Sequence, residues 1–246
     1  DPSQLRGYLD VAGQKAQVVV ANPAGITCDG CGFINAHRAT LTTGTPQFDG
    51  SGSLTGYRVD SGSIIVGGSG MDASRVDQTD ILARAVEVNA GLWASELTVT
   101  TGANLVSAGN AAQAERRAAS GDTPQFALDV SAIGGMYAGK ITMTGTEKGV
   151  GVRVAGYMGA AVGEAVITAD GRLENSGRIG AAQRLTLNAD SIDNRSCGEI
   201  AAGHTDIPAT TLTNRGRIDG SQTQLRATTL NNAGSGKIYG DSLQIN

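Results

Sequence analysis

Aliphatic and polar residues recur at a regular spacing in the last third of the chain. From about residue 169 onward, four segments share one template: an aliphatic residue, any residue, Asn, a short spacer, Gly, any residue and Ile. The leading aliphatic residues stand at positions 173, 192, 212 and 230, so successive copies lie 19, 20 and 18 residues apart. A second aliphatic residue separates the copies, at Leu185, Ile207, Leu225 and Leu243. The pattern predicts two or three short strands per copy, joined at Asn-x-Gly segments that favour left-handed or turn geometry.

A repeat of about 20 residues made of strands and turns is typical of a β-solenoid. One unit cannot bury its own apolar face, so neighbouring units must stack at the inter-strand distance of about 4.8 Å. Equivalent aliphatic residues then line the interior, and an Asn that recurs in every coil can pair its amide with the next one. We therefore predict an all-β parallel β-helix with an asparagine ladder formed by Asn175, Asn194, Asn214 and Asn232.

Short aliphatic runs bounded by Gly, Asn and Thr continue the pattern upstream with a looser period, at residues 61–68, 83–106, 139–145 and 162–171. They predict further coils. Residues 110–120, NAAQAERRAAS, interrupt them with an Ala-rich, charged run that lacks β-branched residues. Such a run predicts a loop excursion, a short helix or a connector.

Composition supports an interior of small residues and excludes some partners. Only 4% of the 246 residues are aromatic, whereas 36 are Gly, which suits stacked layers of Val, Ile, Leu and Ala. The net charge is −4 and the 19 Lys and Arg residues are scattered, so we expect no nucleic-acid partner. No apolar run reaches the roughly 18 to 20 residues of a membrane span, so we expect no transmembrane segment. We interpret the start at Asp1, without an initiator Met, as that of a fragment.

Two stretches resemble a known family. Residues 18–48 (VVVANPAGITCDGCGFINAHRATLTTGTPQF) and 81–106 (ILARAVEVNAGLWASELTVTTGANLV) resemble the later part of the secretion domain of two-partner-secretion exoproteins. That family includes filamentous haemagglutinins, large adhesins and contact-dependent growth inhibition proteins. Residues 133–153 and the Asn-x-Gly repeats resemble the start of the haemagglutinin repeat region. The resemblance implies a right-handed parallel β-helix that is exported unfolded, via the periplasm, through an outer-membrane barrel partner to the bacterial cell surface.

The resemblance also implies a recognition motif and a division of the chain. The family's Asn-Pro-Asn-Gly-Ile motif corresponds to Asn22, Pro23, Ala24, Gly25 and Ile26, with Ala24 in place of the usual Asn. The motif is expected to contact the periplasmic domains of the transporter, but a purely structural turn between coils fits the same residues. We expect residues 1–109 to be the later part of the secretion domain, 110–168 to be a connector with the first shaft coils, and 169–246 to be haemagglutinin-type repeats.

The cysteines admit three interpretations. Cys28 and Cys31 could form half of a zinc site, with His37, Cys197 and His204 as further ligands, but a second close pair is missing. A thioredoxin-type redox pair would need a βαβ context, which the sequence lacks. For an extracellular protein, a local disulfide between Cys28 and Cys31 is favoured over a metal site and over reduced thiols. Cys197 is then unpaired, and we expect it to be buried as a small apolar residue.

Other candidate chemistry is weaker. Residues 67–72 fit six positions of a calcium-binding nonapeptide, but calcium sites of that type need tandem copies, and only one is present. The glycines of residues 149–156 lack a complete phosphate-binding fingerprint. Asp72, Asp77 and Asp80 are spaced by five and three residues, which does not place all three on one strand face. We expect no metal, no cofactor and no enzymatic activity.

Three function classes follow. The favoured one is a secretion-domain and shaft segment of a large surface exoprotein that serves adhesion or the delivery of a distal effector in contact-dependent growth inhibition. A second is a face that binds a receptor or glycan on a host or neighbouring cell. The third is a carbohydrate-active β-helix enzyme, because this fold also houses such enzymes.

Overall fold

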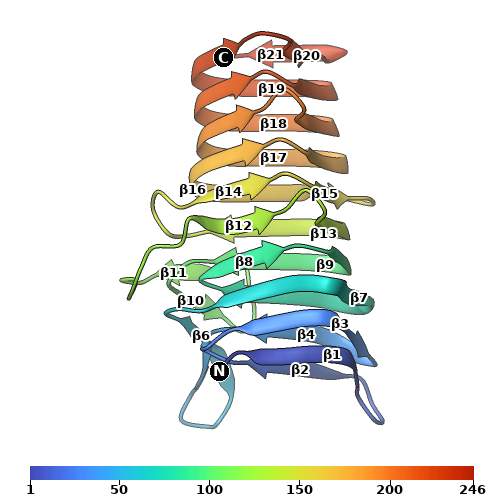
Figure 1. Ribbon diagram of the computed structural model, residues 1–246, viewed down its shortest axis with the longest axis vertical. Coiled ribbons are helices and arrows are strands. Elements are labelled where there is room, and N and C mark those ends of the chain that lie inside the picture. The colour runs from blue at the N-terminus through green and yellow to red at the C-terminus, as the bar shows by residue number, and fades with distance from the viewer.

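The computed structural model describes residues 1–246, which wind as a right-handed parallel β-helix (Figure 1). Every regular element is a strand, and no helix is long and apolar enough to cross a membrane. The β-helix is built from β1 (Ser3–Asp10), β2 (Ala16–Ala21), β3 (Ile26–Ile34), β4 (Ala36–Thr42), β7 (Ser63–Ala83), β8 (Ala85–Val88), β9 (Gly91–Thr101), β12 (Phe126–Val130), β13 (Gly135–Gly145), β14 (Gly151–Val154), β15 (Tyr157–Ala160), β16 (Ala165–Asn175), β17 (Arg178–Asn194), β18 (Glu199–Asn214), β19 (Arg217–Asn232), β20 (Lys237–Ile238) and β21 (Ser242–Ile245). The prediction of an all-β parallel β-helix is confirmed.

Strand register places equivalent residues of the sequence template above one another. The leading aliphatic residues pair in sequence from coil to coil, as Leu173 with Ile192, Ile192 with Leu212, and Leu212 with Leu230. The closing Ile residues do the same, from Ile179 through Ile200 to Ile218 and Ile238. The sequence period is therefore one circuit of the β-helix.

The interior is one continuous apolar core that runs through the coils. It contains 46 buried residues, of which Phe33 is the only aromatic one, and the others are chiefly Val, Ile, Leu, Met and Ala. Fully burying one Val, Leu or Ile side chain contributes about 1.5–3 kcal/mol before the entropy cost of ordering the chain. Each coil buries too few such residues to be stable alone, so stability depends on stacking.

The glycines of the repeat template serve a purpose beyond the geometry predicted for them. Gly177, Gly198, Gly216 and Gly236 are absent from the residues with positive φ, so of the two expected geometries, left-handed or turn, these positions adopt the turn, as at Gly198, whose amide donates to the carbonyl of Arg195. A Cβ on Gly198 would clash with the side-chain oxygen of Asn194 and would lie 2.6 Å from the carbonyl oxygen of Asn175. The template requires Gly because neighbouring coils approach too closely at this corner for any side chain.

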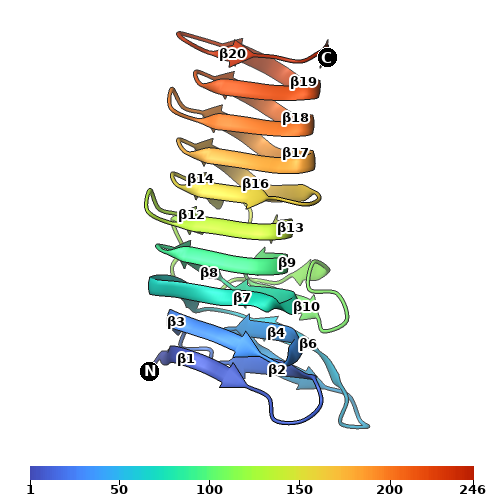
Figure 2. The same ribbon diagram turned by 90° about the vertical axis from the view of Figure 1, so that its right-hand side faces the viewer.

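A second, antiparallel sheet packs against the early coils (Figures 1 and 2). It consists of β5 (Thr45–Phe48), β6 (Leu54–Val59), β10 (Asn104–Ser107) and β11 (Ala114–Arg116), in the spatial order β5, β6, β10, β11. Its hairpins leave the β-helix between β4 and β7 and between β9 and β12. The run at 110–120 is therefore a loop excursion that carries β11, and the helix considered for it does not form because Ala114–Arg116 pairs with β10.

Apolar contacts and buried ion pairs hold this side sheet on the β-helix. Tyr57, Val59 and Val106 form a small core with Leu82, which lies on β7. Arg38 of β4 lies 2.6 Å from the carboxylate of Asp80 and donates a hydrogen bond to the carbonyl of residue 108. Arg84 pairs with Glu147 at 2.8 Å, and the two side chains are only 6% and 13% exposed. Burial of these pairs makes the loss of either partner costly.

Candidate functional site

The segment Asn22–Ile26 forms a tight turn between the first two coils. The carbonyl of Asn22 accepts a hydrogen bond from the amide of Gly25 at 3.0 Å, which closes a four-residue turn. The side-chain oxygen of Asn22 accepts a second bond, from the amide of Ala24 at 2.9 Å. Gly25 adopts a φ of 119°, a conformation that residues with a Cβ rarely adopt. The sequence Asn-Pro-x-Gly therefore has a local structural reason at two of its four positions, Asn22 and Gly25.

The side-chain amide of Asn22 is committed within the protein. It donates to the carbonyl of Asp1 at 3.0 Å and to the hydroxyl of Ser3 at 2.9 Å, so Asn22 ties the turn to the start of β1. By contrast, Pro23 and Ala24 are exposed at the corner of the coil. A partner protein can therefore contact this motif at the ring of Pro23 and the methyl group of Ala24.

The last motif residue anchors the turn in the core. Ile26 is 1% exposed and begins β3, and Gly25 beside it is also buried. In the next coil, Gly62 packs against the turn: a Cβ there would lie 2.6 Å from the carbonyl oxygen of Pro23. The motif thus has a buried part, Gly25 and Ile26, and an exposed tip formed by Pro23 and Ala24.

The structure joins Cys28 and Cys31 in a disulfide across a corner of β3. Their Cα atoms are 5.3 Å apart, and both residues are buried in the apolar core. Gly30 between them has a φ of 69°, which lets the chain turn within the four-residue loop. Such a short covalent loop contributes little by restricting the unfolded chain, because that effect grows with loop length. His37, the nearest candidate zinc ligand in sequence, is exposed.

Residues 67–72 follow the disulfide corner in the next coil. Asp29 accepts a hydrogen bond from the amide of Ser69 at 2.9 Å, and a Cβ on Gly68 would clash with the Asp29 carboxylate. The glycines that resemble a calcium-binding repeat therefore make room for the loop beneath them. No group of three or more His, Cys, Asp or Glu side chains lies close enough together to hold a metal ion.

The three aspartates considered for catalysis have separate partners. Asp80 is fully buried beside Arg38, and Asp77 forms an ion pair with Lys15 at 3.8 Å. Asp72 accepts hydrogen bonds from the hydroxyl of Ser74 at 2.6 Å and from that of Tyr8 at 3.1 Å. The bond from Ser74 is the main reason that the pKa of Asp72 lies below its usual value, which leaves it ionised and unsuited to act as an acid.

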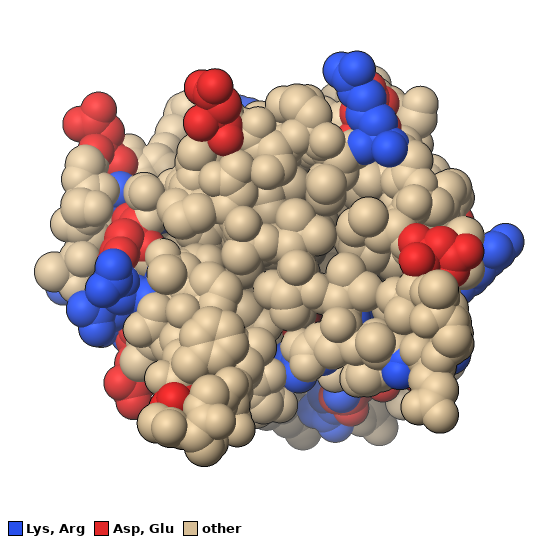
Figure 3. All heavy atoms as spheres, turned by 90° about the horizontal axis from the view of Figure 1, so that it is seen from below, with Lys and Arg blue, Asp and Glu red and all other residues tan.

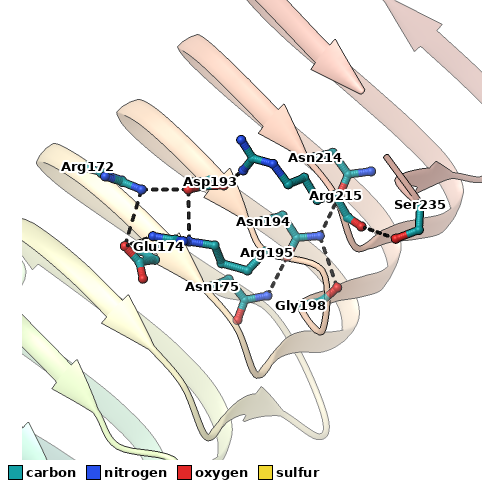
Figure 4. Close-up of polar contacts among 10 residues, drawn as sticks. All are labelled: Arg172, Glu174, Asn175, Asp193, Asn194, Arg195, Gly198, Asn214, Arg215 and Ser235. Carbon is teal, nitrogen blue, oxygen red and sulfur yellow. Dashed lines mark hydrogen bonds and ion pairs between the residues drawn. The ribbon is translucent and has the colours of Figure 1, made fainter. Parts of the chain in front are cut away.

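The four repeat asparagines lie one above the next and form a continuous chain of amide hydrogen bonds, and the first three asparagines are drawn in Figure 4. The side-chain nitrogen of each donates to the side-chain oxygen of the next at 2.8 Å, from Asn175 to Asn194, Asn214 and Asn232. Each nitrogen also donates to at least one backbone carbonyl at the adjoining turn, as Asn194 does to Gly198 at 3.2 Å. Asn175, Asn194 and Asn214 are completely buried, and their amides satisfy one another.

The same column continues upstream with apolar residues. Val154 pairs with Asn175, and the column then runs down the β-helix through Val130, Val88 and Val66 to Cys28. One structural position therefore changes from an apolar to an amide side chain between β14 and β16. The shift marks a change in how the turn is stabilised, from apolar packing to a hydrogen-bonded ladder.

Charged side chains flank the ladder on the outer surface of the same coils (Figure 4). Asp193 contacts Arg172 at 2.7 Å, Arg195 at 3.1 Å and Arg215 at 2.8 Å. Arg195 also lies 3.0 Å from Glu174. The arginines are about half exposed, so water and salt screen each pair, although together they form a network across three coils.

The expectation of a buried Cys197 is wrong, because its side chain is exposed. The spacer between Asn and Gly is one residue long after Asn175 and three residues long after Asn194. The two extra residues extend the turn outward while Asn194 and Gly198 keep their stacked positions, so Cys197 lies in solvent.

Several surface features escaped sequence reasoning. The turn residues Asp49-Gly-Ser-Gly, which lie between two segments of strand-forming residues, could have predicted the hairpin β5–β6. Its pairing with β10 depends on the fold and could not have been predicted. Three aromatic residues also stack on the outer surface of neighbouring coils, at Trp93, Tyr137 and Tyr157. Their alignment depends on coil register, which a looser upstream period does not disclose.

The end of the β-helix nearest the Asn22–Ile26 turn has a distinct surface. Viewed along the axis from the side of β1, Lys, Arg, Asp and Glu lie toward the rim, and the centre is largely uncharged (Figure 3). Leu5, Val18 and Val20 of β1 and β2 are only partly buried there.

Fold and turn together define a parallel β-helix with a tight Asn-Pro-x-Gly turn between its first two coils. The family model of the TPS secretion domain matches residues 1–175, which include both the Asn22–Ile26 turn and Asn175. The chain therefore belongs to the two-partner-secretion (TPS) domain family. The matched range extends beyond residue 109 into the ladder coils.

Known relatives agree with this assignment. The chain is similar to Toxin CdiA of Yersinia pestis, with 57% identity over 197 residues, and to the tRNA nuclease CdiA of Yersinia mollaretii, with 40% identity over 250 residues. These matches cover 78% and 99% of this chain but only 6% and 8% of the relatives. A solved filamentous haemagglutinin secretion domain is similar over 100% of this chain and 71% of its own, with 26% identity and a TM-score of 0.62.

Membership of the TPS family indicates where the chain is located and one protein that it interacts with. As a TPS domain, it is secreted via the periplasm to the bacterial cell surface and depends on an outer-membrane TPS transporter. The part matched by the family model is the secretion domain of such an exoprotein. The predictions of family, fold and secreted location are confirmed.

Proposed function

We propose that the exposed tip of the Asn22–Ile26 turn is a contact for the periplasmic domains of the transporter. The observation that carries this proposal is the contrast in exposure within the motif. Asn22 is hydrogen-bonded to the start of β1 and Ile26 is buried, whereas Pro23 and Ala24 are exposed. A small rigid apolar tip suits a weak, reversible protein contact. The Ala24 side chain contributes only a methyl group, so it contacts the transporter through its surface shape and not through a side-chain amide.

We propose a three-part division of the chain around this contact. Residues 1–109 act as the later part of the secretion domain, 110–168 connect it to the first shaft coils, and 169–246 form haemagglutinin-type repeats. The change of one column from Val154 to Asn175 supports a distinct construction for the last part. In the parent exoprotein, the shaft would support adhesion or hold a distal effector away from the cell, as in contact-dependent growth inhibition. The toxin and nuclease names belong to relatives of which this chain spans 5–8%.

The transporter contact can be tested with a double substitution at the tip. Pro23→Asp combined with Ala24→Asp should weaken capture by the isolated periplasmic domains of the cognate transporter by about tenfold or more, because two charges replace the apolar contact. Secretion of the chain from cells that express the transporter should fall in parallel. A matched control is Ser196→Asp, which places a charge on an exposed turn of a later coil.

A substitution at Asn22 separates recognition from structure. Asn22→Ala removes the bonds to Asp1 and Ser3 and should lower the midpoint of urea unfolding, whereas the tip double variant should leave that midpoint unchanged. Equal capture of the tip variant and of the unsubstituted chain would show that the motif is only a turn between coils.

A further inference from the structure

The aromatic residues Trp93, Tyr137 and Tyr157 form a stack on the outside of three consecutive coils. Their ring centroids are 5.9 Å apart between Trp93 and Tyr137, and 4.8 Å apart between Tyr137 and Tyr157, with interplanar angles of 12° and 20°. Rings this far apart and nearly parallel are offset, so each covers its neighbour only in part. Trp93 is 44% exposed and Tyr137 is 42% exposed. The stack therefore leaves aromatic surface open to solvent.

Glycines next to each ring make this arrangement possible. Gly91, Gly135 and Gly159 each lie two residues from the ring on the same strand, and a Cβ at any of them would clash with that ring. At Gly135, for example, the Cβ would lie 2.5 Å from the Tyr137 ring. Three strands in succession thus combine an outward aromatic residue with a glycine that gives it room. None of the three rings belongs to the buried apolar core, so the core does not explain their presence.

A groove of about 750 Å³ runs beside the stack on the same outer face. Ser95 and Gly139 line it, each two residues beyond a stacked ring on its own strand and thus on the same side of the sheet. Its polar side chains are Ser74, Asp77, Ser95, Glu96 and Lys140. The groove is large enough for several sugar rings, and its polar groups lie within one or two coils of Trp93 and Tyr137.

The chemistry of this face selects among possible occupants. Both edges of β9 are already paired, to β7 and β13, so an added peptide strand has no free backbone edge to use. Only Ala94 and Val162 of the groove lining are hydrophobic, which is too little for an amphipathic helix. The carboxylates of Asp77 and Glu96 are balanced by the ammonium groups of Lys15 and Lys140, so the groove has no excess of positive charge to attract a polyanion. What remains is a neutral ligand that offers flat apolar faces and many hydroxyl groups.

We propose that this groove binds a neutral oligosaccharide. Sugar rings pack their apolar faces against Trp93 and Tyr137, and their hydroxyl groups exchange hydrogen bonds with Ser95, Glu96 and Lys140. The ligand lies along the axis of the β-helix, across the coils that contain β7, β9, β13 and β15. This site is separate from the turn at Asn22–Ile26, so its outcome does not depend on transporter recognition.

Trp93 is the only tryptophan in the chain, so its fluorescence reports directly on the site. Titration of the 246-residue chain with cellohexaose, chitohexaose or maltohexaose at millimolar concentrations should shift the emission for at least one of them. Calorimetric titration with that sugar should show about tenfold weaker binding for Tyr137→Ala. Gly163→Leu should weaken binding similarly by filling the groove, because a Cβ there has room, at 3.6 Å from the carbonyl oxygen of Gly139. The control Phe48→Ala removes an exposed ring from the side sheet and should leave binding unchanged.

Several results would overturn the proposal. One is the absence of any emission shift with all three hexasaccharides. Another is binding of a sulfated heparin fragment in preference to the neutral sugars, because that would indicate a different ligand class. A third is unchanged affinity in Gly163→Leu, which tests the groove even if Tyr137→Ala fails to fold. Circular dichroism and thermal unfolding of each variant establish that it is folded before it is titrated.

Discussion

Replacing Asn194 by Ala tests whether the asparagine ladder stabilises the last coils. Asn194 lies in the middle of the ladder and is completely buried. Its nitrogen donates to the side-chain oxygen of Asn214 at 2.8 Å and to two backbone carbonyls, and its oxygen accepts from Asn175 at 2.8 Å. Ala removes all of these bonds and leaves a small cavity between the two neighbouring amides.

The expected magnitude follows from the groups left without partners. The oxygen of Asn214 loses its only side-chain donor, whereas the nitrogen of Asn175 keeps one bond, to the carbonyl of Glu199. Each buried polar group left unsatisfied costs about 1–3 kcal/mol. With one side-chain group left unsatisfied and a second that loses one of its two bonds, we expect Asn194→Ala to lower the free energy of unfolding by about 2–4 kcal/mol.

The matched control is Asn232→Ala at the exposed end of the same ladder. There the nitrogen of Asn214 loses one bond but keeps another, to the carbonyl of Lys237, and water can replace the lost partner. We expect a loss of about 1 kcal/mol or less. Equilibrium unfolding in urea, followed by circular dichroism, gives both values, and they are comparable if the slope m is the same for both variants. Equal losses for Asn194→Ala and Asn232→Ala would refute the reasoning.

Three further predictions concern the turn glycines, a buried ion pair and acid sensitivity. Gly198→Ala should destabilise by about 1–3 kcal/mol in urea unfolding, because its Cβ clashes with the side chain of Asn194. Arg84→Met should cost about 2–3 kcal/mol, because it leaves the nearly buried Glu147 carboxylate unpaired. The pKa of Asp72 is lowered in the folded state, so its contribution to stability is present above the unfolded pKa and is lost as the pH falls through the folded pKa. The stability difference between the unsubstituted chain and Asp72→Asn should therefore shrink in urea titrations below about pH 4.

Each of these predictions has its own control. Gly50→Ala introduces a Cβ with no atom within 4 Å and should change stability by less than about 0.5 kcal/mol. Arg58→Met breaks an exposed pair with Asp60 and should cost less than about 1 kcal/mol. A loss at Gly198 or Arg84 no larger than in its control contradicts the corresponding argument. For Asp72, the contradicting result is a stability difference that stays constant with pH.

Sequence reasoning reached the parts of the molecule in which the repeat is regular. Asn175 and Asn194 were placed on one column because 19 residues separate them and each coil of the β-helix is one circuit. It failed at the turn after Asn194, where an insertion places Cys197 in solvent. It also missed the role of Gly198, which depends on how closely the next coil approaches. Errors of this kind arise because a template records which residue recurs and not what lies beside it in the neighbouring coil.

The amino-acid sequence by itself determined that this chain is a parallel β-helix, because a solenoid repeats the same local interaction in every coil. A local period is visible along the chain, and stacking follows from the apolar faces it creates. Only the tertiary structure decided that the excursions at 45–59 and 104–116 join in one antiparallel sheet, and that Trp93 and Tyr137 stack beside a groove. These features depend on the register between coils and on pairing across about 50 residues, where loop length varies without changing the local pattern.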